Sequence, residues 1–194
     1  MFAIPWYTVI LESIPQMFLI IKIGFELFNI KIDLGKTIAI STLIAFCTYF
    51  IRQAPLFGLH TLVLVLLLAL FATFFYKINW WYSLVSSLTG TMIMGLIEKV
   101  WLDVIFEITS TSVDDLSAYT WFNMIIFALI LIMASLLYVI IKRFHFTIYD
   151  LNNNERDASL TVIVIILSSC FLLLSFSHSI VTNPENIAFK TFYC

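Results

Sequence analysis

Apolar residues form long uninterrupted runs in this chain, separated by short polar stretches. A helix that crosses a bilayer needs about 20 mainly apolar residues. Six runs approach that length and predict spanning helices at about residues 3–28, 35–52, 58–76, 80–98, 118–141 and 159–177. The strands of a membrane β-barrel would instead alternate apolar and polar residues. The pattern therefore predicts an all-α, polytopic integral membrane helix bundle with about six transmembrane helices.

The composition supports lipid as the main solvent of this bundle. Hydrophobic residues make up 62% of the 194 residues and charged residues only 11%, whereas soluble domains carry about 25% charged residues. One core could not hide this much apolar side chain from water. We therefore expect a multi-pass protein of the cell membrane. The net charge is −2 and no basic patch occurs, so a nucleic acid is not expected as a partner.

The positive charges predict the orientation of the chain, because Lys and Arg are enriched in cytoplasmic loops. Loops 1, 3 and 5 contain six of these residues: Lys31, Lys36, Lys77, Lys142, Arg143 and Arg156. The opposite side contains three: Arg52, Lys99 and Lys190. Loops 1, 3 and 5 should therefore be cytoplasmic, and both chain ends should lie outside.

Polar segments divide the chain further. Residues 150–158 (DLNNNERDA) are its only strongly polar run. They separate a five-helix unit, 1–150, from a second part, 151–194, which comprises a polar cytoplasmic loop, the sixth helix and a short outer tail. Residues 99–117 have apolar positions at helical spacing and are expected to form a short amphipathic helix on the outer membrane surface. The N-terminus lacks the features of a signal peptide and is expected to begin the first membrane helix.

Four ionisable residues on four predicted helices share one expected depth near the outer face. They are Glu12, Arg52, His60 and Glu98. Ionisable groups inside a membrane are costly and often functional, so these four form a candidate ligand-binding site. Opposite charges are available to pair, and a histidine among carboxylates would respond to external pH. The alternative is that these helix ends simply carry interfacial charges that reach water.

Small residues on the predicted helix 80–98 suggest close packing. Two rows have spacing of four residues: Ser83, Ser87, Thr91 and Gly95, and Ser86 with Gly90. Small residues at this spacing let helix backbones approach closely in lipid. We expect tight packing within the bundle, and a homodimer seam is the alternative. On the first helix, Lys22 and Glu26 can pair along one face.

Catalytic and metal-binding patterns are not apparent. The three cysteines, Cys47, Cys170 and Cys194, form no CxxC or Cys/His cluster, so neither a disulfide framework nor a metal site is predicted. HExxH, GxSxG and phosphate-binding loop motifs are missing from the sequence. The sequence thus indicates a protein that is not an enzyme and needs no cofactor.

Three segments carry a family resemblance: ESIPQMFLIIKIGFELFNIK, YFIRQAPLFGLHTLVLVLLL and GLIEKVWLDVIFEI. Over roughly residues 10–150 the chain resembles the N-terminal membrane sensor region of Gram-positive bacterial sensor histidine kinases with a GHKL-type ATPase domain. These kinases have a layout like that of peptide-pheromone receptors. The best motif comprises Arg52, Pro55, Gly58, His60 and Thr61. The sequence has no phosphoacceptor-histidine segment or ATP-binding boxes, so kinase activity is not implied. The chain is then either a sensor-only protein or a fragment of a longer one.

The resemblance implies the input region of a two-component signalling system. Its expected partners are a peptide or small hydrophobic ligand, a kinase or other membrane protein, and the lipid bilayer. The alternative is a small transporter or permease component, in which Pro15 would break the first helix, although the two halves show no matching pattern. A membrane enzyme is a third option that no motif supports.

Overall fold

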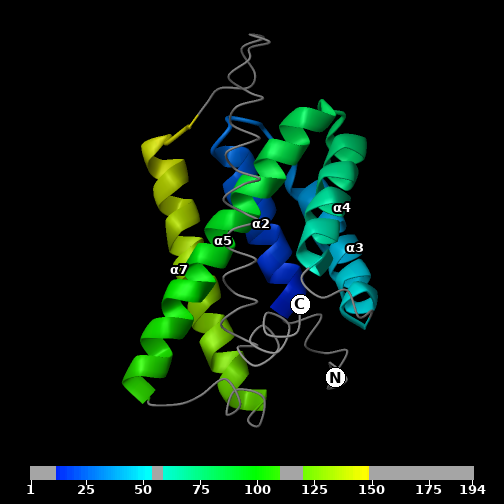
Figure 1. The fold of residues 1–194 in the computed structure, drawn as a ribbon. Helices are drawn as coiled ribbons and strands as arrows, with labels where there is room; N and C mark the ends of the chain where they lie inside the picture. Colours follow the sequence, from blue (N-terminus) through cyan, green and yellow to red (C-terminus); the bar gives the residue numbers. More distant parts are fainter. Residues whose placement is uncertain (1–11, 54–58, 110–119, 149–194) are drawn as a thin grey trace, which may run out of the picture.

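The computed structural model describes residues 12–53, 59–109 and 120–148, and all regular structure in these ranges is helical (Figure 1). The helices are α2 (Ile14–Glu26), α3 (Leu34–Gln53), α4 (Leu59–Tyr76), α5 (Trp80–Thr109) and α7 (Thr120–Phe144). The prediction of an all-α chain is confirmed for this part. The sixth predicted span, 159–177, lies outside the described residues, as do residues 3–11 of the first.

Two stretches of the described part are long and apolar enough to cross a membrane, Leu34–Ile51 and Met124–Phe144. Thr61–Tyr76 is also apolar but shorter. The bounds of α3, α4 and α7 agree with the predicted runs to within a few residues. Pro15 stands in the first turn of α2, where its missing N–H is not needed by the helix.

Polar residues fix where two helices begin. Asp33 precedes α3, and its carboxylate accepts a hydrogen bond from the Lys36 N–H at 3.2 Å. Asn79 precedes α5, and its side-chain oxygen accepts one from the Trp81 N–H at 3.3 Å. Both are N-caps, which satisfy backbone donors that have no partner inside a helix.

The prediction of a separate surface helix at 99–117 is wrong for its described part, because α5 continues without a break from Trp80 to Thr109. No proline interrupts this stretch. Trp101, Leu102 and Ile105 are partly buried against the core. The apolar positions that suggested a surface helix therefore extend the packing face of α5. At about 1.5 Å per residue, its 30 residues reach about 45 Å.

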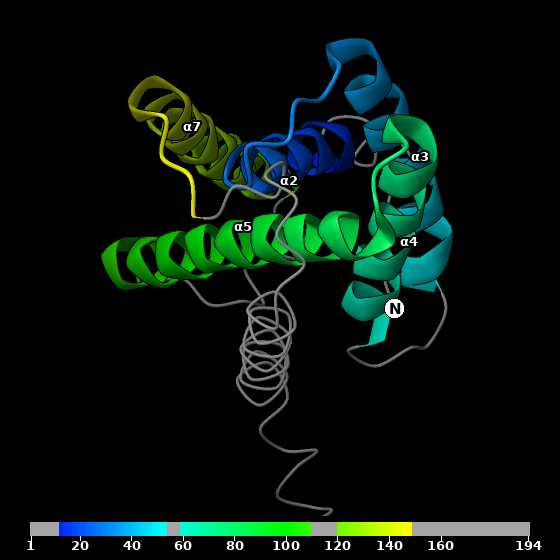
Figure 2. The ribbon, with the colours of Figure 1, turned by 90° about the horizontal axis from the view of Figure 1, so that it is seen from above.

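Helix α2 is the centre of the bundle. It contacts α3, α5 and α7, while α4 packs against α3 and α5. The helices α2, α3, α4 and α5 thus form a ring of neighbours, and α7 lies on the other side of the α2–α5 pair from α3 and α4 (Figure 2). Every residue from Leu19 to Phe25 is buried, so α2 has no lipid- or water-facing side over this stretch.

The closest approach between helices joins α2 to α5 at two glycines. A Cβ atom added to Gly24 would collide with the Ser86 carbonyl oxygen and would lie 3.2 Å from the Gly90 Cα. A Cβ atom on Gly90 would collide with the Ile20 carbonyl oxygen. The obstacles are backbone atoms, which cannot rotate away. This contact therefore requires glycine on both helices.

The small-residue prediction is confirmed for Ser83, Ser86, Ser87 and Gly90, and it is wrong for Gly95. Ser86 and Gly90 form the contact with α2, and Ser83 and Ser87 are also fully buried. Gly95 is exposed, and an added Cβ atom there would meet nothing within 4 Å. The expectation that Gly95 packs in the bundle is wrong, because α5 has turned this position away from its neighbours.

Candidate functional site

The predicted outer site is distributed over the four helices of the ring. Arg52 lies in the last turn of α3, His60 in the first turn of α4, and Glu12 just before α2. The start of α2, the end of α3 and the start of α4 lie at the same end of the bundle (Figure 1). Glu98 lies on α5, whose C-terminal half runs beside α7 and away from α3 and α4 in both views (Figures 1 and 2).

The side chains of Arg52 and His60 lie outside the described part of the structure. Those of Glu12 and Glu98 are half-buried. The convergence of the four groups on one site therefore stays a prediction. The ring of helices places three of the four backbone positions at one end, and the fourth, Glu98, belongs to the C-terminal half of α5.

The opposite end of the bundle, where loops 1 and 3 and the end of α7 meet, has a described polar network. Lys22 is only 8% exposed although it carries a charge. Its ammonium lies 5.9 Å from the centre of the Phe18 ring, within the range of a cation–π contact. The charges of Glu26, Lys142 and Asp33 also act on it. The pairing of Lys22 with Glu26 stays a prediction, and Lys142 of α7 and Asp33 of the first loop are further charges near Lys22.

A hydrogen-bond chain fastens the α3–α4 pair at this end. The Thr37 hydroxyl lies 2.7 Å from both the Asp33 carbonyl oxygen and the Tyr76 hydroxyl. A hydroxyl has one proton to donate. Because Thr37 donates it to Asp33, the Tyr76 hydroxyl must donate to Thr37. The Tyr76 ring also packs against Phe25 of α2, with ring centres 5.7 Å apart. The contacts of Tyr76 therefore join α2, α3 and α4.

Removal of this hydrogen bond should weaken the bundle measurably. We expect Tyr76→Phe and Thr37→Val each to lower the free energy of unfolding by about 1 kcal/mol. The double variant should lose less than the sum, because the two changes remove the same bond. Thermal unfolding in detergent of the wild type, the two single variants and the double variant measures this difference. Tyr82→Phe on α5 is the control. Fully additive losses would contradict the assigned bond.

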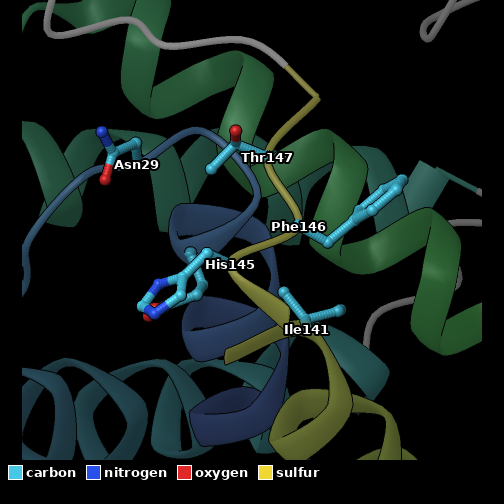
Figure 3. Close-up of a pocket in the computed structure, with 6 residues that line it drawn as sticks. Asn29, Ile141, His145, Phe146 and Thr147 are labelled. Carbon is cyan, nitrogen blue, oxygen red and sulfur yellow. The ribbon is translucent and has the colours of Figure 1, made fainter. Parts of the chain in front are cut away.

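A cavity of about 300 Å³ lies between the ends of α2 and α7. The residues that line it are Glu26, Asn29, Ile141, His145, Phe146 and Thr147. The side chains of Asn29 and His145 lie on one side of the segment that follows α7, and the ring of Phe146 points to the other (Figure 3). The hydrogen bond from the Ile148 N–H to the Leu27 carbonyl, at 2.8 Å, ties this segment to the end of α2.

The sequence did not predict this cavity, although it contains a weak signal for the helix ends that form it. Asn29 and His145 each follow an apolar run and adopt positive φ angles, 55° and 48°. Asparagine after the last apolar residue of a helix is a known stop signal. That signal gives the helix end, but it does not reveal that the ends of α2 and α7 lie together.

Within the described ranges, no three His, Cys, Asp or Glu side chains gather closely enough to hold a metal ion. The lining of the cavity offers the Glu26 carboxylate and the polar side chains of Asn29, His145 and Thr147. Comparison of the chain with protein-family models, with curated proteins and with solved structures found no match.

Proposed function

We propose that this protein is a multi-pass membrane module that senses a signal and regulates a partner, without enzymatic activity of its own. In this proposal it acts as the input region of a two-component signalling system. The single observation that carries the membrane part is the exposure of the two helical stretches that are long and apolar enough to cross a membrane. The signalling part is supported by the resemblance over roughly residues 10–150 and by the central position of α2.

The exposure argument separates a membrane helix from the core helix of a soluble protein. Only 33% of Leu34–Ile51 and 22% of the most apolar stretch within Met124–Phe144 are buried inside the bundle. Large side chains on α7 are exposed: Ile125, Leu129, Ile132, Leu136, Val139 and Ile140. A soluble monomer rarely exposes so extensive an apolar surface. Lipid around α3, α4 and α7 accounts for it, and the second part of the chain would add the sixth predicted span.

The position of α2 supports a route for the signal. Glu12 precedes this helix at the proposed outer end, and Lys22 and Glu26 belong to the network at the other end. Because α2 is buried and locked to α5 through two glycines, a shift at one end would displace the pair as a unit. Small rigid-body shifts of packed helices are a common form of signalling transition.

Gene deletion in the host tests the signalling role. We expect deletion to change the transcripts of a limited set of genes and the wild-type chain to restore them. The double variant Arg52→Gln with Glu98→Gln should reach the membrane in equal amount yet fail to restore them. The variant Lys99→Gln, next to Glu98, is the matched control. Unchanged transcripts together with altered uptake of a solute would instead establish a transporter.

A further inference from the structure

The cavity between α2 and α7 is built from two helix ends of the same type. At α2, the Ile30 N–H donates to the Phe25 carbonyl and the Asn29 N–H to the Glu26 carbonyl, both at 3.0 Å. At α7, the Phe146 N–H donates to the Ile141 carbonyl at 3.0 Å and the His145 N–H to the Lys142 carbonyl at 3.4 Å. Each pattern is a Schellman motif, in which the residue with positive φ ends the helix.

Two helix C-termini that meet at one cavity give it a negative potential. Each C-terminus carries about half a negative charge from the aligned peptide dipoles. The half-buried Glu26 carboxylate adds a full charge to the lining. The cationic side chains nearby, Lys22, Lys142 and Arg143, offset this charge around the cavity, but none of them lines it. The lining therefore favours a cationic group.

The hydrogen-bond acceptors of the lining favour an ammonium with N–H donors over a quaternary ammonium. The Glu26 carboxylate, the Asn29 amide oxygen and the Thr147 hydroxyl can all accept N–H donors. A quaternary ammonium has no N–H donor and is usually recognised by several aromatic rings. Phe146 is the one aromatic ring in the lining apart from the His145 imidazole, and the Phe146 ring points away from Asn29 and His145 (Figure 3).

The surroundings of the cavity favour a phospholipid as the carrier of this ammonium. Lys142 and Arg143 form the exposed last turn of α7, and they can bind a phosphate next to the ammonium. Phe144, Phe146 and Ile148 are also exposed at this end. Apolar side chains beside basic ones suit the boundary between headgroups and acyl chains.

We infer that this cavity binds the phosphoethanolamine headgroup of a phosphatidylethanolamine lipid in the cytoplasmic leaflet. The ammonium enters the cavity toward Glu26 and Asn29, and the phosphate binds the side chains of Lys142 and Arg143. The inference rests on the membrane part of the proposed function and not on the signalling part. It makes this end of the bundle responsive to the headgroup composition of the membrane.

The test uses the full chain in lipid nanodiscs and counts retained lipids by native mass spectrometry. The discs contain phosphatidylcholine with an equal share of phosphatidylethanolamine or of its mono- or dimethylated forms. We expect preferential retention of phosphatidylethanolamine, which falls with each added methyl group. Glu26→Gln should reduce the preference for phosphatidylethanolamine about tenfold, because the loss of one charge-assisted hydrogen bond typically lowers an affinity by about this factor. Glu107→Gln, an exposed carboxylate on α5, is the matched control.

Asn29→Gly serves as a second variant, because glycine keeps the positive φ angle while removing the amide. Asn29→Gly should also lower the preference for phosphatidylethanolamine, and it provides a test if Glu26→Gln fails to fold. Equal retention of phosphatidylethanolamine and phosphatidylcholine would overturn the inference, as would displacement of the lipid by soluble phosphoethanolamine at low concentration. A chain that does not enter the nanodiscs at all would instead refute the membrane part of the proposed function.

Discussion

Alanine at Gly24 or Gly90 should destabilise the bundle more than any other single methyl addition in its described part. The new Cβ atom would collide with a backbone carbonyl on the facing helix, so the α2–α5 pair would have to separate. Overpacking of a rigid core typically costs about 1–3 kcal/mol. We expect the upper end of this range or more, because no side-chain rotation can relieve the collision.

Gly95→Ala provides the control on the same helix. Nothing lies within 4 Å of a Cβ atom at this position, and alanine is favoured over glycine in a helix by about 1 kcal/mol. The control should therefore melt at the wild-type temperature or slightly above it in detergent. A temperature drop of similar size in Gly95→Ala and Gly90→Ala would show that the α2–α5 contact is not the cause.

A charge placed on the outer face of α7 should block membrane insertion. Ile132 is 55% exposed near the middle of this helix. Arginine is tolerated at such a position in a soluble protein, because the side chain would lie in water. At the centre of a membrane helix, replacing isoleucine with arginine costs about 3 kcal/mol on the insertion scale. We expect Ile132→Arg to shift the insertion equilibrium about a hundredfold toward the non-integrated form.

Phe144→Arg is the matched control for this experiment. Phe144 is 73% exposed at the last position of α7 and follows Lys142 and Arg143. This position is expected at the cytoplasmic boundary, where a further arginine suits the distribution of charge. The variant should integrate like the wild type, as measured by resistance to alkaline extraction of membranes. Normal integration of Ile132→Arg, or its recovery as a folded soluble protein, would refute the membrane location of α7.

Local sequence determined which segments are helical and where several of them begin and end. Long apolar runs fixed α3, α4 and α7, because each contains its own backbone hydrogen bonds and needs no partner to be helical. Asp33 and Asn79 act on donors within three residues, so their capping effect is also local. Asn29 illustrates the same point, since its backbone conformation depends mainly on its own short polar side chain.

Tertiary structure decided which surfaces meet. Two small-residue rows on α5 have the same spacing, yet only the row with Gly90 faces Gly24, because the choice depends on the rotation of both helices. The joining of residues 99–109 to α5 depends on partners that Trp101 and Ile105 find in the core. The cavity at Glu26 and His145 likewise exists only because α2 and α7 end side by side. Such contacts bring together residues far apart in the chain, and spacing along one helix carries no information about its neighbour.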